Sequence, residues 1–340
     1  MRFEDYWYIV AESSELRGDA VLGRSVLNER LACFRGSDGS ATVLPDRCLH
    51  RNAPLSLGRV QQGVLACPYH GWRYDGKGRV VDIPSQATAP DYGHCLEPYE
   101  CRELDGYVYV RVNRDAPAEI EPWPYLQHEP SGRRTIRLRN RFESTVTNCV
   151  ENFIDIPHTA FVHSGIFRTT RGEGIRASVE RKDGAVHVRY RNERANLGTW
   201  SRFLNPRRVE IRHTDSFYVP NVTCVTYEIG QRVFIITSQS VPVGGDDGGD
   251  TIVYTDLTYD FGLFSDIARP FVRRYGQRVI DQDVAILRAQ MTNIRRYGAE
   301  FRDTPADFIH RCVESLRGAL ARGEDPRSLP TISREIEFFV

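Results

Sequence analysis

Two short segments that pair a cysteine with a histidine constrain this chain more than any other feature. They read C-L-H at residues 48–50 and C-P-Y-H at residues 67–70, with sixteen residues between them. A zinc finger pairs like residues, C-x2–4-C and then H-x3–5-H. A cysteine with a histidine in each pair instead suits a [2Fe–2S] cluster, in which one iron takes both cysteines and the other both histidines. A zinc site, or four unrelated buried residues, is the alternative for Cys48, His50, Cys67 and His70.

The pattern along the chain predicts two domains of different build. Residues 1–115 contain short strand-like segments separated by turn signals, which indicates a small all-β domain. Four prolines between residues 115 and 130 indicate a linker, which we place at 116–134. Residues 135–340 predict an α+β domain, with strands between about 175 and 260 and helices at about 263–298 and 304–322.

A second group of potential metal ligands lies at residues 144–163, where the pattern is helical. His163 follows His158 by five residues, which is about 140° around a regular helix. Pro157 gives the helix a reason to bend or end between them, so that both imidazoles could face one ion. Taken alone, two such histidines are more often structural.

Two histidines and one carboxylate bind Fe(II) on one face and leave open positions for O₂ and substrate. The carboxylate must come from elsewhere in the chain, and we prefer Asp283. Its predicted helix buries Ile280, Val284 and Leu287, so that Asp283 borders the apolar face. Asp281 is the competing candidate.

The segments C-L-H-R-N-A-P-L from residue 48 and C-P-Y-H-G-W-R-Y from residue 67 resemble the two signature segments of Rieske proteins. The pattern N-x-x-D-x-x-H-x4-H at residues 152–163 and the acidic helix around Asp283 extend the resemblance over nearly the whole chain. The chain is similar to α-subunits of Rieske non-haem iron oxygenases of the vanillate O-demethylase and dicamba monooxygenase type. This resemblance implies an α+β fold: an N-terminal all-β Rieske domain, then a helix-grip-like (START-type) catalytic domain with an antiparallel sheet and C-terminal helices.

The resemblance also implies roles for individual residues. The cluster ligands would be Cys48, His50, Cys67 and His70, and the ligands of a mononuclear Fe(II) would be His158, His163 and Asp283. Asp155 would bridge the two centres, accepting hydrogen bonds from His158 and from His70 of a neighbouring subunit. Asn152 would lie near the iron and tune it.

The reaction and the partners are likewise implied by the family. Electrons would come from NAD(P)H through a separate flavin reductase, a ferredoxin or both, with O₂ as co-substrate. The short chain resembles α-subunits that work without a β-subunit, which favours a homotrimer. We expect monohydroxylation or oxidative O- or N-dealkylation of a small aromatic or cyclic substrate. Ring cis-dihydroxylation is an alternative, and an electron-transfer protein without oxygenase chemistry is an alternative of another class.

Charge and hydropathy exclude several classes of partner. Lys plus Arg equals Asp plus Glu at 45 each, so no basic excess favours a nucleic acid or an anionic membrane. No apolar run approaches the roughly 18 residues needed to span a bilayer. The N-terminal segment has neither the basic region nor the apolar region of a signal peptide. The sequence therefore predicts a cytoplasmic protein.

The substrate pocket is expected against the strands of residues 200–260. The candidates for its walls are Phe203, Phe217, Tyr218, Val225, Tyr227, Phe234 and Ile236. An anionic substrate or plain solvent exposure would each explain Arg202, Arg207 and Arg208, so the sequence does not name the substrate.

Overall fold

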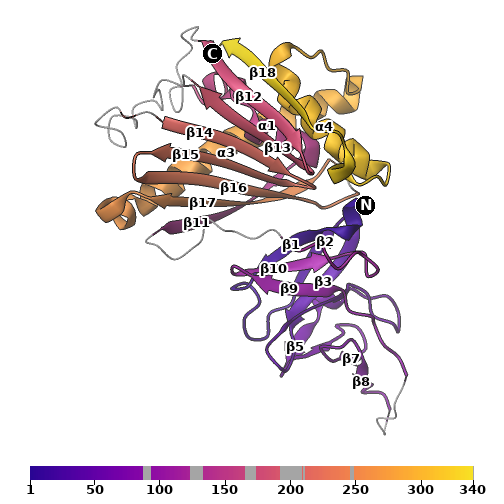
Figure 1. Cartoon of the computed structure of the whole chain (residues 1–340). Coiled ribbons are helices and arrows are strands. Elements are labelled where there is room, and N and C mark those ends of the chain that lie inside the picture. Colours follow the sequence, from indigo (N-terminus) through magenta and orange to yellow (C-terminus); the bar gives the residue numbers. More distant parts are fainter. Residues whose placement is uncertain are drawn as a thin grey trace. The chain divides into compact units, whose positions relative to one another are not determined.

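The chain folds into two compact units in a computed structural model (Figure 1). The structure describes residues 1–86, 93–122, 133–164, 174–191, 209, 211–245 and 249–339. The N-terminal unit is Phe3–Pro124 together with Val243–Gly245, and the C-terminal unit is Tyr125–Pro242 and Asp246–Val340 together with Met1–Arg2. The middle of the predicted linker, residues 123–132, lies outside the described part.

The N-terminal unit consists of short antiparallel strands in three small sheets. The sheet orders are β1-β10-β9, β2-β3-β4 and β5-β6-β7-β8. Alternating or continuous apolar residues in β3, β4 and β10 supply the buried faces, as the short β-segments predicted. The strands are β1 (Trp7–Glu12), β2 (Leu22–Val26), β3 (Glu29–Arg35), β4 (Ala41–Pro45), β5 (Arg59–Gln61), β6 (Val64–Ala66), β7 (Arg73–Tyr74), β8 (Val80–Asp82), β9 (Glu100–Leu104) and β10 (Tyr107–Arg111).

The C-terminal unit is built on one antiparallel sheet of eight strands. Its order is β11-β17-β16-β15-β14-β13-β12-β18, so hairpins along the chain form most of the sheet. The last strand pairs with β12 at one edge, and β11 forms the other edge. The strands are β11 (Arg134–Phe142), β12 (Gly174–Lys182), β13 (Ala185–Arg191), β14 (Ile211–Tyr218), β15 (Val222–Ile229), β16 (Arg232–Pro242), β17 (Thr251–Asp260) and β18 (Ile332–Phe339).

Within the described residues of this unit, three α-helices pack on a single face of the sheet (Figure 1). They are α1 (Val146–Ile154), α3 (Ser265–Tyr297) and α4 (Phe308–Ala321). Paired residues on neighbouring strands point to the same side, and the register therefore identifies that face. One row runs through Val179, Val188, Asp215, Val225, Ile236 and Leu257. The first two residues of this row lie in the core that α4 shares, and Leu257 lies in the core under α3.

Helix α1 is short because its sequence contains both a start and a stop signal. The Thr145 hydroxyl caps it by accepting a hydrogen bond from the backbone N–H of Asn148. The helix ends at Ile154, and Pro157 opens a separate 3-10 turn, Pro157–Ala160. The predicted break near Pro157 is therefore confirmed, and the helical pattern at 144–163 is two elements.

Both predicted C-terminal helices are confirmed, whereas strand β18 was not foreseen. Residues 332–339 alternate as I-S-R-E-I-E-F-F, but only the fifth and seventh side chains are buried, so their periodicity is a weak signal. The predicted fold class, an N-terminal β domain followed by an antiparallel sheet with long helices, is confirmed. In the described part of the chain, no helix is both long and apolar enough to cross a membrane.

Candidate metal centres

The two cysteine–histidine pairs lie on loops of the N-terminal unit that close tightly on themselves. In the first loop, the N–H of Asn52 donates to the carbonyl of Cys48. In the second, the N–H of Gly71 donates to the carbonyl of Cys67, and Gly71 has a φ of 76°. Residues with a side chain rarely adopt that conformation, which explains a glycine directly after His70.

The four predicted cluster ligands come together between these loops. The thiols of Cys48 and Cys67 are buried in the core of the unit, while both imidazoles are closer to its surface. The rings of His50 and His70 meet edge to face with centroids 4.5 Å apart. Trp72 stacks flat on His50 at 5.0 Å, and this contact fixes the orientation of that imidazole.

The four donor groups can serve as metal ligands, and their spacing suits two irons better than one zinc ion. Burial raises the pKa of the Cys67 thiol, so a metal must stabilise its thiolate. Partial burial and the neighbouring His70 and Arg51 lower the pKa of His50, which keeps that imidazole neutral for ligation. A tetrahedral zinc ion would need the ligand atoms of these four residues close together. Among these described residues, however, no three have ligand atoms within 4.8 Å of one another.

The tyrosine at position 74 adds a polar contact that the sequence did not single out. Its hydroxyl lies 3.2 Å from Cys48 Sγ and accepts a hydrogen bond from the backbone N–H of Leu49 at 3.0 Å. The side chain is fully buried. This contact holds one cysteine sulfur in a polar environment inside an otherwise apolar core.

A second group of ligands forms in the C-terminal unit from two distant parts of the chain. His158, His163 and Asp283 offer donor atoms that all lie within 4.8 Å of one another. Asp283 Oδ1 lies 3.2 Å from His163 Nε2 and 3.7 Å from His158 Nε2. The histidines follow α1, after the chain turns at Pro157, and Asp283 comes from the middle of α3. The structure thus brings together the three residues that the sequence placed at an iron.

Burial and charge make this group a good fit for a divalent cation. His163 is 2% exposed and Asp283 5%. The approach of His163 to Asp283 lacks hydrogen-bond geometry, and Asp283 Oδ1 is buried without a hydrogen-bond partner in the described chain. A buried carboxylate oxygen without a partner is costly unless a cation occupies the site.

Hydrogen bonding around His163 directs one ring nitrogen toward Asp283. Nδ1 lies 3.0 Å from the side-chain oxygen of Gln282, which accepts from an N–H at that position and leaves Nε2 as a ligand atom. Burial lowers the pKa of His163, but the Asp283 carboxylate and Gln282 more than offset this, and the net pKa is raised. The Asp283 carboxylate therefore favours positive charge at this position.

The remaining predicted residues lie next to this group. Asp155 ends α1, and its Oδ2 accepts the backbone N–H of His158 and lies 3.3 Å from His158 Nδ1. Asn152 lines the adjacent cavity, and its buried side-chain oxygen has no hydrogen-bond partner within the described residues. The competing candidate Asp281 instead accepts a hydrogen bond from Gln277.

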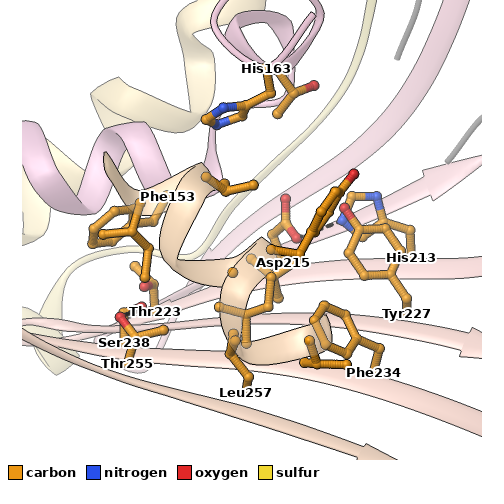
Figure 2. A pocket seen from close by; sticks show the side chains of 18 of the residues that line it. Phe153, His163, His213, Asp215, Thr223, Tyr227, Phe234, Ser238, Thr255 and Leu257 are labelled. Atoms are coloured by element: carbon orange, nitrogen blue, oxygen red, sulfur yellow. Dashed lines mark hydrogen bonds and ion pairs between the residues drawn. The ribbon is translucent and has the colours of Figure 1, made fainter. Parts of the chain in front are cut away.

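A cavity of about 670 Å³ opens beside His158, His163 and Asp283, and most of its lining is apolar (Figure 2). Helices α1 and α3 form one wall, and strands β14 to β17 form the other. Four predicted wall residues line it, namely Val225, Tyr227, Phe234 and Ile236. Its size is that of a small-molecule site.

Two predicted wall residues, Phe217 and Tyr218, do not line the cavity. Phe217 lies on the correct face of β14 but further along the strand, where it is buried in the core with α1 and α4. Tyr218 points to the opposite face because side chains alternate along a strand, and it contacts His187 there. Phe203, Arg202, Arg207 and Arg208 lie outside the described residues.

The sequence missed a buried histidine–aspartate pair in the cavity wall. His213 Nε2 lies 2.9 Å from Asp215 Oδ1 (Figure 2). The Tyr190 hydroxyl donates a hydrogen bond to Asp215 Oδ2 at 2.8 Å. The imidazole is stacked between Tyr190 and Tyr227. The alternation H-x-D in β14 was the available signal, but only strand pairing shows that both side chains face a cavity.

Comparison with family models matches two regions of the chain. A model described as the Rieske [2Fe-2S] domain matches residues 6–97, which include all four predicted cluster ligands. A model described as the vanillate O-demethylase oxygenase C-terminal domain matches residues 142–308, which include His158, His163 and Asp283.

Several curated proteins are similar over part of the chain. The methylxanthine N1-demethylase NdmA of Pseudomonas putida is 29% identical over 54% of this chain and 54% of its own length. The toluene-4-sulfonate monooxygenase iron-sulfur subunit TsaM1 of Comamonas testosteroni is 28% identical over 53% of this chain and 52% of its own. Chlorophyllide a oxygenase of Chlamydomonas reinhardtii is 32% identical over 48% of this chain and 25% of its own length. The chain thus spans about half or less of the length of these relatives.

Solved structures match the fold over nearly the whole chain. Dicamba monooxygenase bound to 3,6-dichlorosalicylic acid has a TM-score of 0.81 at 20% identity, covering 94% of this chain and 98% of that one. A mutant of Pseudomonas putida NdmA with caffeine has a TM-score of 0.76 at 20% identity, covering 97% and 96%. At this identity the structures establish the fold alone. With both family models matched in order along this fold, the chain belongs to the Rieske oxygenase α-subunit family.

Proposed function

We propose that this chain is the oxygenase component of a Rieske-type system that monohydroxylates or oxidatively O- or N-dealkylates a small aromatic or cyclic compound. The observation that carries the proposal is the buried group of His158, His163 and Asp283, which opens onto a cavity of about 670 Å³. Two histidines and one carboxylate are the ligand set of non-haem Fe(II) oxygenases. Bound there, the iron would supply the activation of O₂, with electrons from the [2Fe–2S] cluster.

We propose a role for each part of the site. Cys48, Cys67, His50 and His70 hold the cluster. The apolar cavity excludes water and orients the substrate beside the iron ligands. Asp155 holds His158 and carries the coupling to the cluster of a neighbouring subunit, while Asn152 presents a polar atom next to the iron ligands.

The partners and the assembly belong to the same proposal. We propose a homotrimer that receives electrons from NAD(P)H through a flavin reductase, a ferredoxin or both, and that works in the cytoplasm. One relative supports a multicomponent system, since it is described as the iron-sulfur subunit of a monooxygenase system. We divide the chain into a Rieske domain at 1–115, a linker at 116–134 and a catalytic domain at 135–340.

The alternatives differ in what the C-terminal unit does. A Rieske electron-transfer protein needs neither a second ligand group nor a cavity. This chain has a second ligand group and a cavity beside it, which favours the oxygenase. A ring cis-dihydroxylating dioxygenase would use the same ligands, so product analysis has to separate it from a monooxygenase.

The experiment that tests the function is substrate-stimulated O₂ uptake. The protein is loaded with both metal centres, supplied with a ferredoxin reductase system and screened against small aromatic and N- or O-methylated compounds, with mass spectrometry of products. We expect stimulated uptake and a product that carries one oxygen atom or has lost one methyl group. His158→Ala should show neither. Stimulated product formation by His158→Ala would refute the iron site.

A further inference from the structure

The sheet side of the cavity is sorted into rows of different polarity. Thr223 on β15 pairs with Ser238 on β16, which pairs with Thr255 on β17. All three line the cavity, and we call them the hydroxyl row. Figure 2 shows these three side chains gathered on the strands, below Phe153. The next row, two residues or about 7 Å further along the strands, is apolar at the same three positions: Val225, Ile236 and Leu257.

The hydroxyl row contains one cavity-lining hydroxyl without a hydrogen-bond partner among the described residues. Ser238 and Thr255 are satisfied by each other, because their hydroxyl oxygens lie 3.1 Å apart. Thr223 is 2% exposed, yet its hydroxyl makes no hydrogen bond to any residue that the structure describes. Leaving such a group unpaired in an apolar wall costs free energy. A bound molecule with a hydrogen-bonding group would remove that cost.

The charge of the row selects the kind of group that it can bind. Hydroxyls carry no charge, and each can donate or accept a hydrogen bond. An ionised carboxylate or ammonium placed there would lack a countercharge within the row, which is costly in an apolar site. A neutral carbonyl, amide or hydroxyl is matched by the row, with the adjoining Val225, Ile236 and Leu257 against an apolar ring.

Building on the proposed function, we infer that the hydroxyl row is the subsite that binds a neutral polar substituent of the substrate ring, with Thr223 as its main hydrogen-bonding residue. The substrate class is then a small ring compound with an uncharged oxygen- or nitrogen-containing group. Thr223 is a specificity-determining residue, because it acts on the substrate and not on the metal ligands.

A matched set of three ligands tests this inference by binding alone. The probes are 4-methoxybenzamide, methoxybenzene and 4-methoxybenzoate, which share a ring and differ in having a neutral, an absent or an anionic polar group. Their affinities are measured by equilibrium dialysis against the oxidised, metal-loaded full chain. We expect the amide to bind best and Thr223→Val, which keeps the shape, to weaken its binding roughly five- to tenfold. Binding of methoxybenzene should be unchanged.

The control is Thr226→Val on the same strand, which removes a hydroxyl from the opposite face of the sheet. It should leave all three affinities unchanged. Both variants should have the melting temperature of the wild type. Tighter binding of the benzoate than of the amide would overturn the neutral class. Equal losses for amide and methoxybenzene in Thr223→Val, or no loss for either, would overturn the subsite.

Oxygen uptake by the same variants separates this inference from the proposed function. If the amide binds through Thr223 but no ring compound stimulates O₂ uptake by the wild type, the oxygenase function fails and the subsite stands. If methoxybenzene and the amide stimulate uptake equally in wild type and Thr223→Val, the subsite fails and the oxygenase function stands.

Discussion

The two candidate metal centres are assembled in opposite ways. The four proposed cluster ligands lie within 23 residues of one another in two adjacent loops, and their backbone hydrogen bonds are local. The proposed iron ligands join a segment after α1 to a helix about 120 residues later. A local site depends on loop geometry, whereas a non-local site depends on the whole fold of its unit. Damage to one should therefore leave the other intact.

The largest effect is expected from Cys67→Ser. It removes a thiolate that no nearby group replaces, so the visible absorption of the cluster should disappear and product formation should fall below detection. Iron bound at His158, His163 and Asp283 should remain, measured by metal analysis after cluster loss. Cys95→Ser, at an exposed cysteine, is the control. Loss of both metals in Cys67→Ser would contradict the independence of the two centres.

The reverse experiment is His163→Ala. Removing one of three buried iron ligands should lower product formation by at least about a thousandfold while the cluster spectrum stays unchanged. His310→Ala changes a surface histidine that pairs with Asp307 and should have wild-type activity. A His163→Ala protein that still forms product would show that the iron lies elsewhere.

Asp155→Asn tests the coupling between the centres and should have a smaller effect. The amide keeps the shape but removes the charge next to His158 Nδ1. Substitution of such supporting groups typically costs 10- to 100-fold. We expect both metals to remain bound and reoxidation of the reduced cluster to slow by about 100-fold in single turnover. Asp281→Asn is the matched control on α3, and an unchanged rate in Asp155→Asn would refute the bridging role.

Gln282→Leu should weaken iron binding at the non-local site only. Without the Gln282 oxygen, the ring of His163 loses the contact that fixes its orientation, and the affinity for Fe(II) should fall about tenfold. Gln277→Leu, five residues earlier on α3 and hydrogen-bonded to Asn140 and Asp281, serves as the control. Equal iron affinities of the two variants would show that Gln282 does not support iron binding.

The smallest effect concerns the helix that leads to the histidines. Thr145→Ala removes the N-cap of α1 and should lower the free energy of unfolding of the C-terminal unit by about 1 kcal/mol, with Thr145→Ser restoring it. Denaturant titration followed by the circular dichroism of the helices, which comes from α1, α3 and α4, and by cluster absorbance would report the two units separately. Destabilisation of the cluster by the same amount would show that the units unfold together.

The same contrast explains what could be predicted from the sequence. Local spacing was enough to propose Cys48, His50, Cys67 and His70, and a single proline indicated where α1 ends. The choice of Asp283 over Asp281 rested on the apolar face of one helix, and the roles of these residues stay predictions. Strand register decides which side chains share a row, so neither the His213–Asp215 pair nor the hydroxyl row could be predicted from the sequence. The prediction that Phe217 lines the pocket was wrong, because alternation along a strand gives the face of a side chain and not its position along the cavity.

The position of Asp283 also has a consequence for biosynthesis. His70 leaves the ribosome about 210 residues before Asp283. At roughly 5–20 residues per second, the nascent chain can present a complete set of cluster ligands for about 10–40 s before the last iron ligand exists. Cofactor insertion into this protein would then follow the order of translation, with sulfide-bound iron arriving first and the mononuclear ion only after the polypeptide is nearly finished.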